Sequence, residues 1–147
     1  MSKENIIVSA CLFGENCKYS GGNNEIEKEI IKKIEKKYNV ILCCPECLGG
    51  LSTPREPSEI RKGKVFSKSG KDVTDEYKKG AMICLNIAKE NNVKLALMKA
   101  NSPSCGNKKI YDGSFSYVLI DGKGITAKLF EENGIEVISE KELEKLF

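Results

Sequence analysis

The chain has 147 residues, with 24 Lys and Arg against 21 Asp and Glu, a net charge of +3 and no histidine. This length suits one compact domain, no apolar stretch approaches the roughly 20 residues of a membrane span, and the first residues lack the apolar segment of a signal peptide. We therefore expect a single domain over residues 1–147 that acts in the cytoplasm and not in a membrane.

Short apolar runs alternate with helical patterns along the chain, which predicts strands and helices in turn. Strands are expected at 6–10, 40–43, 95–98 and 135–138, and helices at 26–34, 77–88, from about 126 to Gly134, and after a capping box of Ser139 and Glu142. This alternation favours parallel pairing with right-handed crossovers. Turn signals on either side of 115–120 predict an antiparallel hairpin there. The predicted class is α/β: a small three-layer, Rossmann-like domain with a mainly parallel sheet and a short antiparallel excursion.

The segment 49–70 contains several glycines and prolines, and we expect a long irregular loop of the kind that carries function. The only two arginines of the chain, Arg55 and Arg61, fall in it. Their planar forks could hold a carboxylate or a phosphate, or they could form surface ion pairs with Glu56 and Glu59. The remaining charges alternate in sign along helices, which indicates solvated faces and not a nucleic-acid surface.

Cysteines follow three of the predicted strands. Cys11, Cys44 and Cys105 each come just after an apolar run, and the carboxyl ends of parallel strands meet at one edge of a sheet. Three soft ligands at that edge predict a metal or cluster site. Cys84 lies on the apolar face of a predicted helix and Cys43 lies inside a strand, so we expect both in the core. Because the chain has no histidine, general base chemistry falls to a carboxylate or a lysine.

The Cys44-Pro45-Glu46-Cys47 motif fits three uses: a cluster anchor, half of a zinc site, or a redox dithiol. A zinc site of Cys11, Cys17, Cys44 and Cys47 would leave Cys105 unused. A thioredoxin-like dithiol needs a helix that begins within the motif, and no helical period follows it. A zinc-binding or dithiol redox module that uses Cys44 and Cys47 stays the alternative to a cluster enzyme.

Six sequence blocks, in order over nearly the whole chain, resemble the thiouracil desulfidase family. The blocks are Val8-Ser9-Ala10-Cys11-Leu12-Phe13-Gly14, Cys44-Pro45-Glu46, Gly49-Gly50-Leu51-Ser52-Thr53-Pro54-Arg55, Gly70-Lys71-Asp72-Val73-Thr74, Ser102-Pro103-Ser104-Cys105-Gly106 and Ile110-Tyr111-Asp112-Gly113-Ser114-Phe115. The resemblance implies a [4Fe-4S] cluster whose fourth iron is free to bind the sulfur of a thiolated uracil or its nucleotide. It implies hydrolysis to the oxo form with release of sulfide and no net redox change.

By motif position, the resemblance implies that Cys11, Cys44 and Cys105 hold the cluster and that a glutamate and a serine, here Glu46 and Ser102, assist hydrolysis. We assign Arg55 and Ser104 to substrate binding.

The chain departs from the family pattern at two places. It has Lys18-Tyr19-Ser20-Gly21 where the family often has Arg-Tyr-Asp-Gly, so a carboxylate is absent there, and Cys17 and Cys47 are extra thiols near the expected cluster. It lacks the added C-terminal domain of longer relatives that resemble tRNA-acting versions, so we expect a free base or a nucleotide as substrate. A homodimer is a further expectation.

Overall fold

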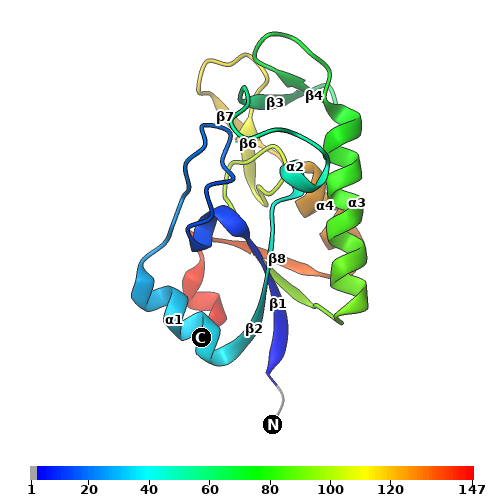
Figure 1. The fold of residues 1–147 in the computed structure, drawn as a ribbon. Coiled ribbons are helices and arrows are strands. Elements are labelled where there is room, and N and C mark those ends of the chain that lie inside the picture. The colour runs from blue at the N-terminus through cyan, green and yellow to red at the C-terminus, as the bar shows by residue number, and fades with distance from the viewer. Residues whose placement is uncertain (1–2) are drawn as a thin grey trace.

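The computed structural model of the chain describes residues 3–147. Its centre is a parallel four-stranded sheet in the order β2-β1-β5-β8, and two antiparallel hairpins, β3-β4 and β6-β7, lie beyond one end of it (Figure 1). The strands are β1 (Glu4–Ser9), β2 (Tyr38–Cys43), β3 (Ser58–Arg61), β4 (Lys64–Ser67), β5 (Leu95–Met98), β6 (Lys109–Tyr111), β7 (Leu119–Asp121) and β8 (Glu136–Ser139). The helices are α1 (Lys28–Lys37), α2 (Pro45–Leu48), α3 (Thr74–Glu90) and α4 (Ile125–Glu132), with 3-10 turns η1 (Ala10–Phe13) and η2 (Leu143–Leu146). The predicted α/β class, with a mainly parallel sheet and a short antiparallel excursion, is confirmed.

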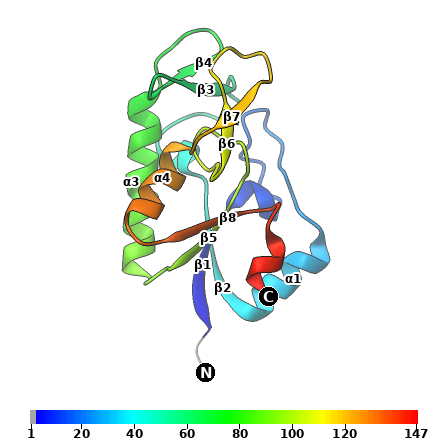
Figure 2. The same ribbon diagram turned by 180° about the vertical axis from the view of Figure 1, so that it is seen from behind.

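Apolar layers on both faces of the sheet make up the core. Central strand β1 is apolar throughout its middle, and Ile6, Ile7 and Val8 are fully buried, as expected for a parallel strand covered on both sides. Ile7 packs toward α3 and α4, and its neighbours Ile6 and Val8 pack toward α1 and η2. Figure 2 shows α3 and α4 together on one side of the sheet, and α1 with the C-terminal turn on the other. Cys43 and Cys84 belong to the apolar layer between the sheet and helices α3 and α4, which confirms their expected place in the core.

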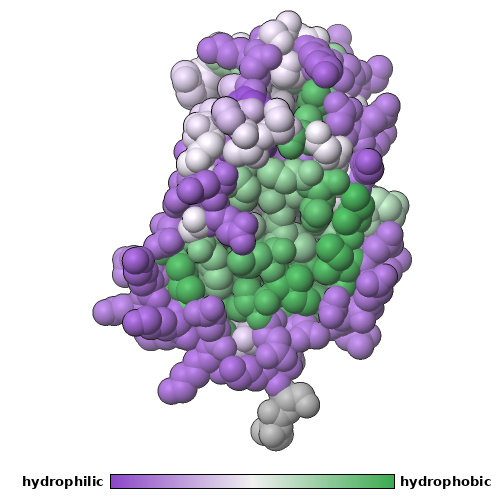
Figure 3. Space-filling model, viewed as in Figure 1, coloured by the Kyte–Doolittle hydropathy of each residue, from purple (hydrophilic) through white to green (hydrophobic). Residues whose placement is uncertain are grey.

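Strand β2 forms one edge of the sheet, and apolar side chains on it and on helices α2 and α3 are partly exposed. Leu42 on this strand and Leu48 on α2 are each 38% exposed, and Met82 on α3 is 48% exposed. Figure 3 shows an apolar area across the middle of this side of the molecule. Edge strands can pair with another chain, so the expected homodimer stays a prediction that this surface allows.

The structure corrects three expectations from the sequence. The segment 49–70 is not wholly irregular, because β3 and β4 form a hairpin whose turn residues Lys62 and Gly63 have positive φ of 52° and 77°. A short helix, α2, does begin within the Cys44–Cys47 motif, with Pro45 in its first turn, a position that proline favours. The expected C-terminal helix is only the 3-10 turn η2, although the backbone N–H of Ser139 donates to Glu142 as a capping box predicts.

No helix among residues 3–147 combines the length and apolar character needed to cross a membrane.

Candidate active site

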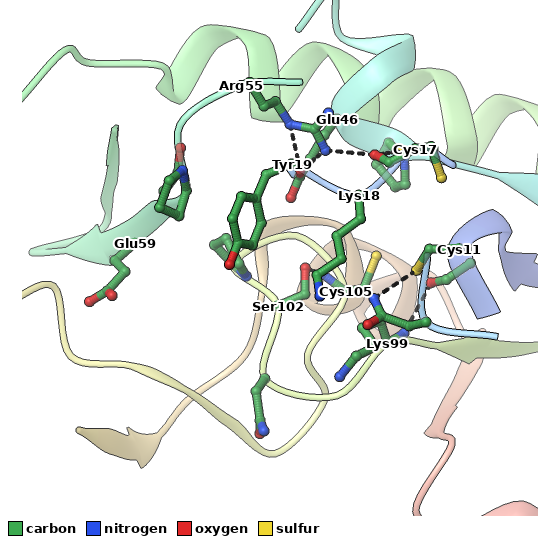
Figure 4. Close-up of a pocket in the computed structure, with 18 of the residues that line it drawn as sticks. Cys11, Cys17, Lys18, Tyr19, Glu46, Arg55, Glu59, Lys99, Ser102 and Cys105 are labelled. Carbon is green, nitrogen blue, oxygen red and sulfur yellow. Dashed lines mark hydrogen bonds and ion pairs between the residues drawn. The ribbon is translucent and has the colours of Figure 1, made fainter. Parts of the chain in front are cut away.

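Strand register brings the three predicted cluster ligands to one cavity. Ser9 at the end of β1 is level with Cys43 at the end of β2, and Val8 is level with Leu97 on β5. Cys11, Cys44 and Cys105, which follow these strands, therefore gather at the same edge of the sheet. All three line a cavity of about 340 Å³. Figure 4 shows Cys11 and Cys105 in its wall.

A hydrogen bond and burial set the environment of two of these cysteines. Cys11 lies in turn η1, and the side-chain amide of Asn24 donates to its sulfur at 3.5 Å. Burial raises the pKa of the Cys11 thiol, and the Asn24 bond opposes this shift. Cys105 is 6% exposed, and burial raises the pKa of its thiol to about 12. A ligand must lose its proton, so both thiols would release protons on binding a metal group.

The third cysteine, Cys44, lies beside two further thiols. Its sulfur is 3.8 Å from the carbonyl oxygen of Cys17, and that of Cys47 is 3.9 Å from the same oxygen. A hydrogen bond with the Cys17 thiol, together with burial, raises the pKa of Cys44. The same hydrogen bond lowers the pKa of the Cys17 thiol. Cys17 lines the cavity with Cys44.

The donor set fits a cluster better than a single metal ion. Among residues 3–147, no three side chains of Cys, Asp or Glu lie close enough together to hold one ion. A zinc site needs four ligands around a single ion, whereas an iron-sulfur cluster takes its cysteines on separate irons. Cys11, Cys44 and Cys105 come from three different strand ends around one cavity, and this spread suits the second arrangement.

Glu46 projects into the cavity from α2 and pairs with Arg55. Nε of Arg55 donates to Oε2 of Glu46 at 3.1 Å, and Nη2 donates to the same oxygen. Arg55 therefore pairs with Glu46, and not with Glu56 or Glu59 as the sequence left open. Burial lowers the pKa of Arg55, but the charge of Glu46 and its hydrogen bond outweigh burial and raise it.

Ser102 lines the cavity and also holds the turn that carries Cys105. Its hydroxyl oxygen accepts bonds from the backbone N–H groups of Ser104 at 3.1 Å and Cys105 at 3.0 Å. The backbone N–H of Gly106 donates to the Ser102 carbonyl at 2.9 Å. One side chain thus connects the cavity wall to the backbone of a predicted ligand.

Two residues that the sequence singled out lie elsewhere. Ser104 is 1% exposed and shares a 2.8 Å hydrogen bond with the Thr126 hydroxyl, and it is not part of the cavity wall. We therefore withdraw it as a substrate contact. Arg61 is exposed, and its guanidinium lies 4.8 Å from the centre of the Phe66 ring.

The structure adds to the cavity wall polar and aromatic residues to which the sequence analysis assigned no role. Lys99 lines the cavity and pairs with Glu140 at 2.9 Å, and Glu140 also accepts the backbone N–H of Ala100 at 2.7 Å. Tyr19 (Figure 4) and Phe115 also line the cavity. Lys99 directly follows a predicted strand, and this position could have indicated that it lies at the site. No sequence spacing indicates its pairing with Glu140.

Comparison with known proteins agrees with this geometry. The family model for 2-thiouracil desulfurase matches residues 6–142. The chain belongs to the 2-thiouracil desulfurase family. It is 45% identical over 148 residues to an uncharacterized protein, YbbK, of Bacillus subtilis (strain 168), and the match covers 94% of this chain and 97% of YbbK. Its fold is similar to that of the [4Fe-4S]-dependent thiouracil desulfidase TudS, with a TM-score of 0.94 and 40% identity over 98% of this chain and 95% of TudS.

Proposed function

We propose that this member of the 2-thiouracil desulfurase family is a [4Fe-4S]-dependent desulfidase. It converts a thiolated uracil, as a free base or a nucleotide, to the oxo form with release of sulfide. The observation that carries the proposal is the meeting of Cys11, Cys44 and Cys105 around one cavity that also contains Glu46 and Ser102. The family match and the likeness to TudS support it.

Cys11, Cys44 and Cys105 would hold the cluster. When bound, the cluster supplies a Lewis-acidic iron that polarises a C=S bond. The overall change is a hydrolysis: the carbon-sulfur bond breaks, the oxygen of water takes the place of sulfur, and no electrons are gained or lost. The seven cysteines are free thiols, which supports a reducing compartment such as the cytoplasm.

Glu46 and Ser102 are the residues for proton transfer. The Glu46 carboxylate can accept a proton from the attacking water, because it lines the cavity and the chain has no histidine to take that role. The Ser102 hydroxyl already accepts two backbone bonds, so its own hydrogen is available to a substrate or a water. Lys99 also lines the cavity, in its ion pair with Glu140.

The cavity supports a pyrimidine nucleotide as well as a base. Its volume of about 340 Å³ lies within the usual range for small-molecule sites. Tyr19, Tyr111 and Phe115 offer rings against which a pyrimidine can stack. Lys18 and Lys68 lie in the same wall and carry the charge that a phosphate needs.

The test compares wild type with Glu46→Gln and Ser102→Ala after anaerobic cluster reconstitution. We expect all three proteins to hold the same iron, Glu46→Gln to lose most sulfide release from thiouracil and from its nucleotide, and Ser102→Ala to lose less, because a water can partly replace a hydroxyl. Wild-type rates in cluster-loaded Glu46→Gln would move the base to another group. A colourless protein that binds zinc would support the alternative module.

A further inference from the structure

Arg55 and Glu46 form a largely buried ion pair in the cavity wall. The Arg55 side chain is 9% exposed and that of Glu46 is 15% exposed. A buried charge is costly unless it is paired, so each side chain restricts where the other can lie. Both bonds from Arg55 end on Oε2 of Glu46, so Oε1 carries no bond from Arg55.

The other N–H groups of Arg55 are also occupied. Nη2 donates to the Cys17 carbonyl at 3.0 Å, and Nη1 donates to the Ser52 carbonyl at 3.1 Å and to the Thr53 hydroxyl at 3.0 Å. A guanidinium has five N–H donors. Within the described chain each of the five has a protein acceptor, so none remains for a substrate phosphate. This differs from the sequence expectation that Arg55 grips the substrate.

These bonds, with one more from Nη1 to the sulfur of Cys47 at 3.9 Å, connect three separate segments. One segment is α2 with Glu46, the second is the loop with Cys17, and the third is the turn of Ser52 and Thr53. The backbone N–H of Arg55 also donates to the Tyr19 carbonyl at 2.7 Å, which joins the Cys17 loop at a second point. A planar fork can satisfy acceptors in several directions at once, and a lysine ammonium cannot reproduce that geometry.

We infer that Arg55 is a positioning residue that fixes the Glu46 carboxylate through Oε2 and leaves Oε1 to act on the substrate. The inference rests on the proposed function, in which Glu46 moves a proton. Arg55 does not touch the substrate in this account. Its contribution is to hold the carboxylate in one place, since a misplacement of about 1 Å can cost about 10²-fold in rate.

Arg61 provides a matched control, because it is the only other arginine and lies over Phe66, away from Glu46. The experiment measures kcat, KM and iron content for wild type, Arg55→Lys and Arg61→Lys, with thiouracil and with its nucleotide. We expect Arg55→Lys to lower kcat for both substrates about 10- to 100-fold, with full iron and with KM changed less than about threefold. Arg61→Lys should stay within about twofold of wild type in both constants.

Two results would overturn the inference. A rise in KM for the nucleotide alone, with kcat unchanged, would return Arg55 to phosphate binding. A fall in kcat that only follows a loss of iron would give Arg55 a role in cluster retention and not in placing Glu46.

A double-mutant cycle of melting temperatures separates failure of this inference from failure of the proposed function. Melting temperatures of wild type, Arg55→Lys, Glu46→Gln and the double variant report the coupling of the two side chains without any turnover. We expect the double variant to lose clearly less than the two single losses combined. Additive losses would refute the pairing, whereas coupled losses in a protein that releases no sulfide from any thiolated uracil would refute only the proposed function.

Discussion

Gly80 on α3 lets this helix approach α2, and its replacement by alanine should disturb the site from a distance. A Cβ at position 80 would lie 2.7 Å from the carbonyl carbon of Pro45 and closer still to its oxygen, and 3.1 Å from the backbone nitrogen of Gly49. Side-chain carbons do not approach backbone atoms within 3.0 Å, so the two helices must separate. Pro45 lies between Cys44 and Glu46, so the separation moves both a predicted ligand and the predicted base.

The expected cost follows from two opposing effects. Overpacking costs about 1–3 kcal/mol, and alanine in a helix regains about 0.5–1 kcal/mol relative to glycine. A net loss of about 1–2 kcal/mol lowers the melting temperature of a chain of this size by roughly 2–8 °C. The shift of α2, on the order of 1 Å, should lower turnover by about 10²-fold. The control is Lys79→Ala, at an exposed neighbouring position on the same helix.

Differential scanning calorimetry and anaerobic sulfide release test this prediction. If Gly80→Ala melts at a higher temperature than wild type and keeps full turnover, then Gly80 affects only the helix propensity of α3, and the close approach of α2 and α3 does not contribute to function.

Three further outcomes are expected. Burial raises the pKa of Glu142, but hydrogen bonds from Asn107 and two lysines outweigh it and lower the pKa to about 2. Since its pKa in the unfolded chain is higher, the Glu142 carboxylate contributes about 1–3 kcal/mol to the free energy of unfolding above pH ~4.5, and this contribution is lost as the pH falls toward 2. The difference in the free energy of unfolding between wild type and Glu142→Gln, measured in urea, should therefore narrow from pH 6 to pH 3, and a constant difference would contradict this. Lys68→Ala should raise KM for the thiolated nucleotide about 3- to 10-fold and leave the free base unaffected; equal changes would remove the phosphate role. Cys84→Ser should keep the iron-sulfur absorbance, because Cys84 is a core residue with 0% exposure, and bleaching would count it among the ligands.

The sequence predicted the sheet well because its signals are local. Each parallel strand is a short apolar run, and the helix pattern after it implies a crossover, so the meeting of Cys11, Cys44 and Cys105 could be expected from the sequence alone. The hairpin β3-β4 was missed because Lys62-Gly63 is a weak turn signal compared with Asn-Gly or Asp-Gly. Helix α2 was missed because four residues are too few for a helical period.

The polar contacts of the site could not be predicted in the same way. The pairing of Arg55 with Glu46 spans nine residues, and that of Lys99 with Glu140 spans 41, and both depend on tertiary packing. A buried arginine can satisfy its donors with any nearby carbonyl, so the presence of Arg55 in a loop did not reveal its partners. The burial of Ser104 beside Thr126 likewise follows from the packing of α4.

Iron binding by single cysteine variants tests the central claim most directly. Anaerobically reconstituted wild type should hold about four iron and four sulfide per chain, as a [4Fe-4S] cluster requires. Each of the substitutions Cys11→Ser, Cys44→Ser and Cys105→Ser should abolish the cluster absorbance, while Cys17→Ser and Cys47→Ser should retain it. Loss of the cluster in Cys17→Ser or Cys47→Ser, together with full iron in Cys105→Ser, would contradict the three-cysteine site proposed for this chain.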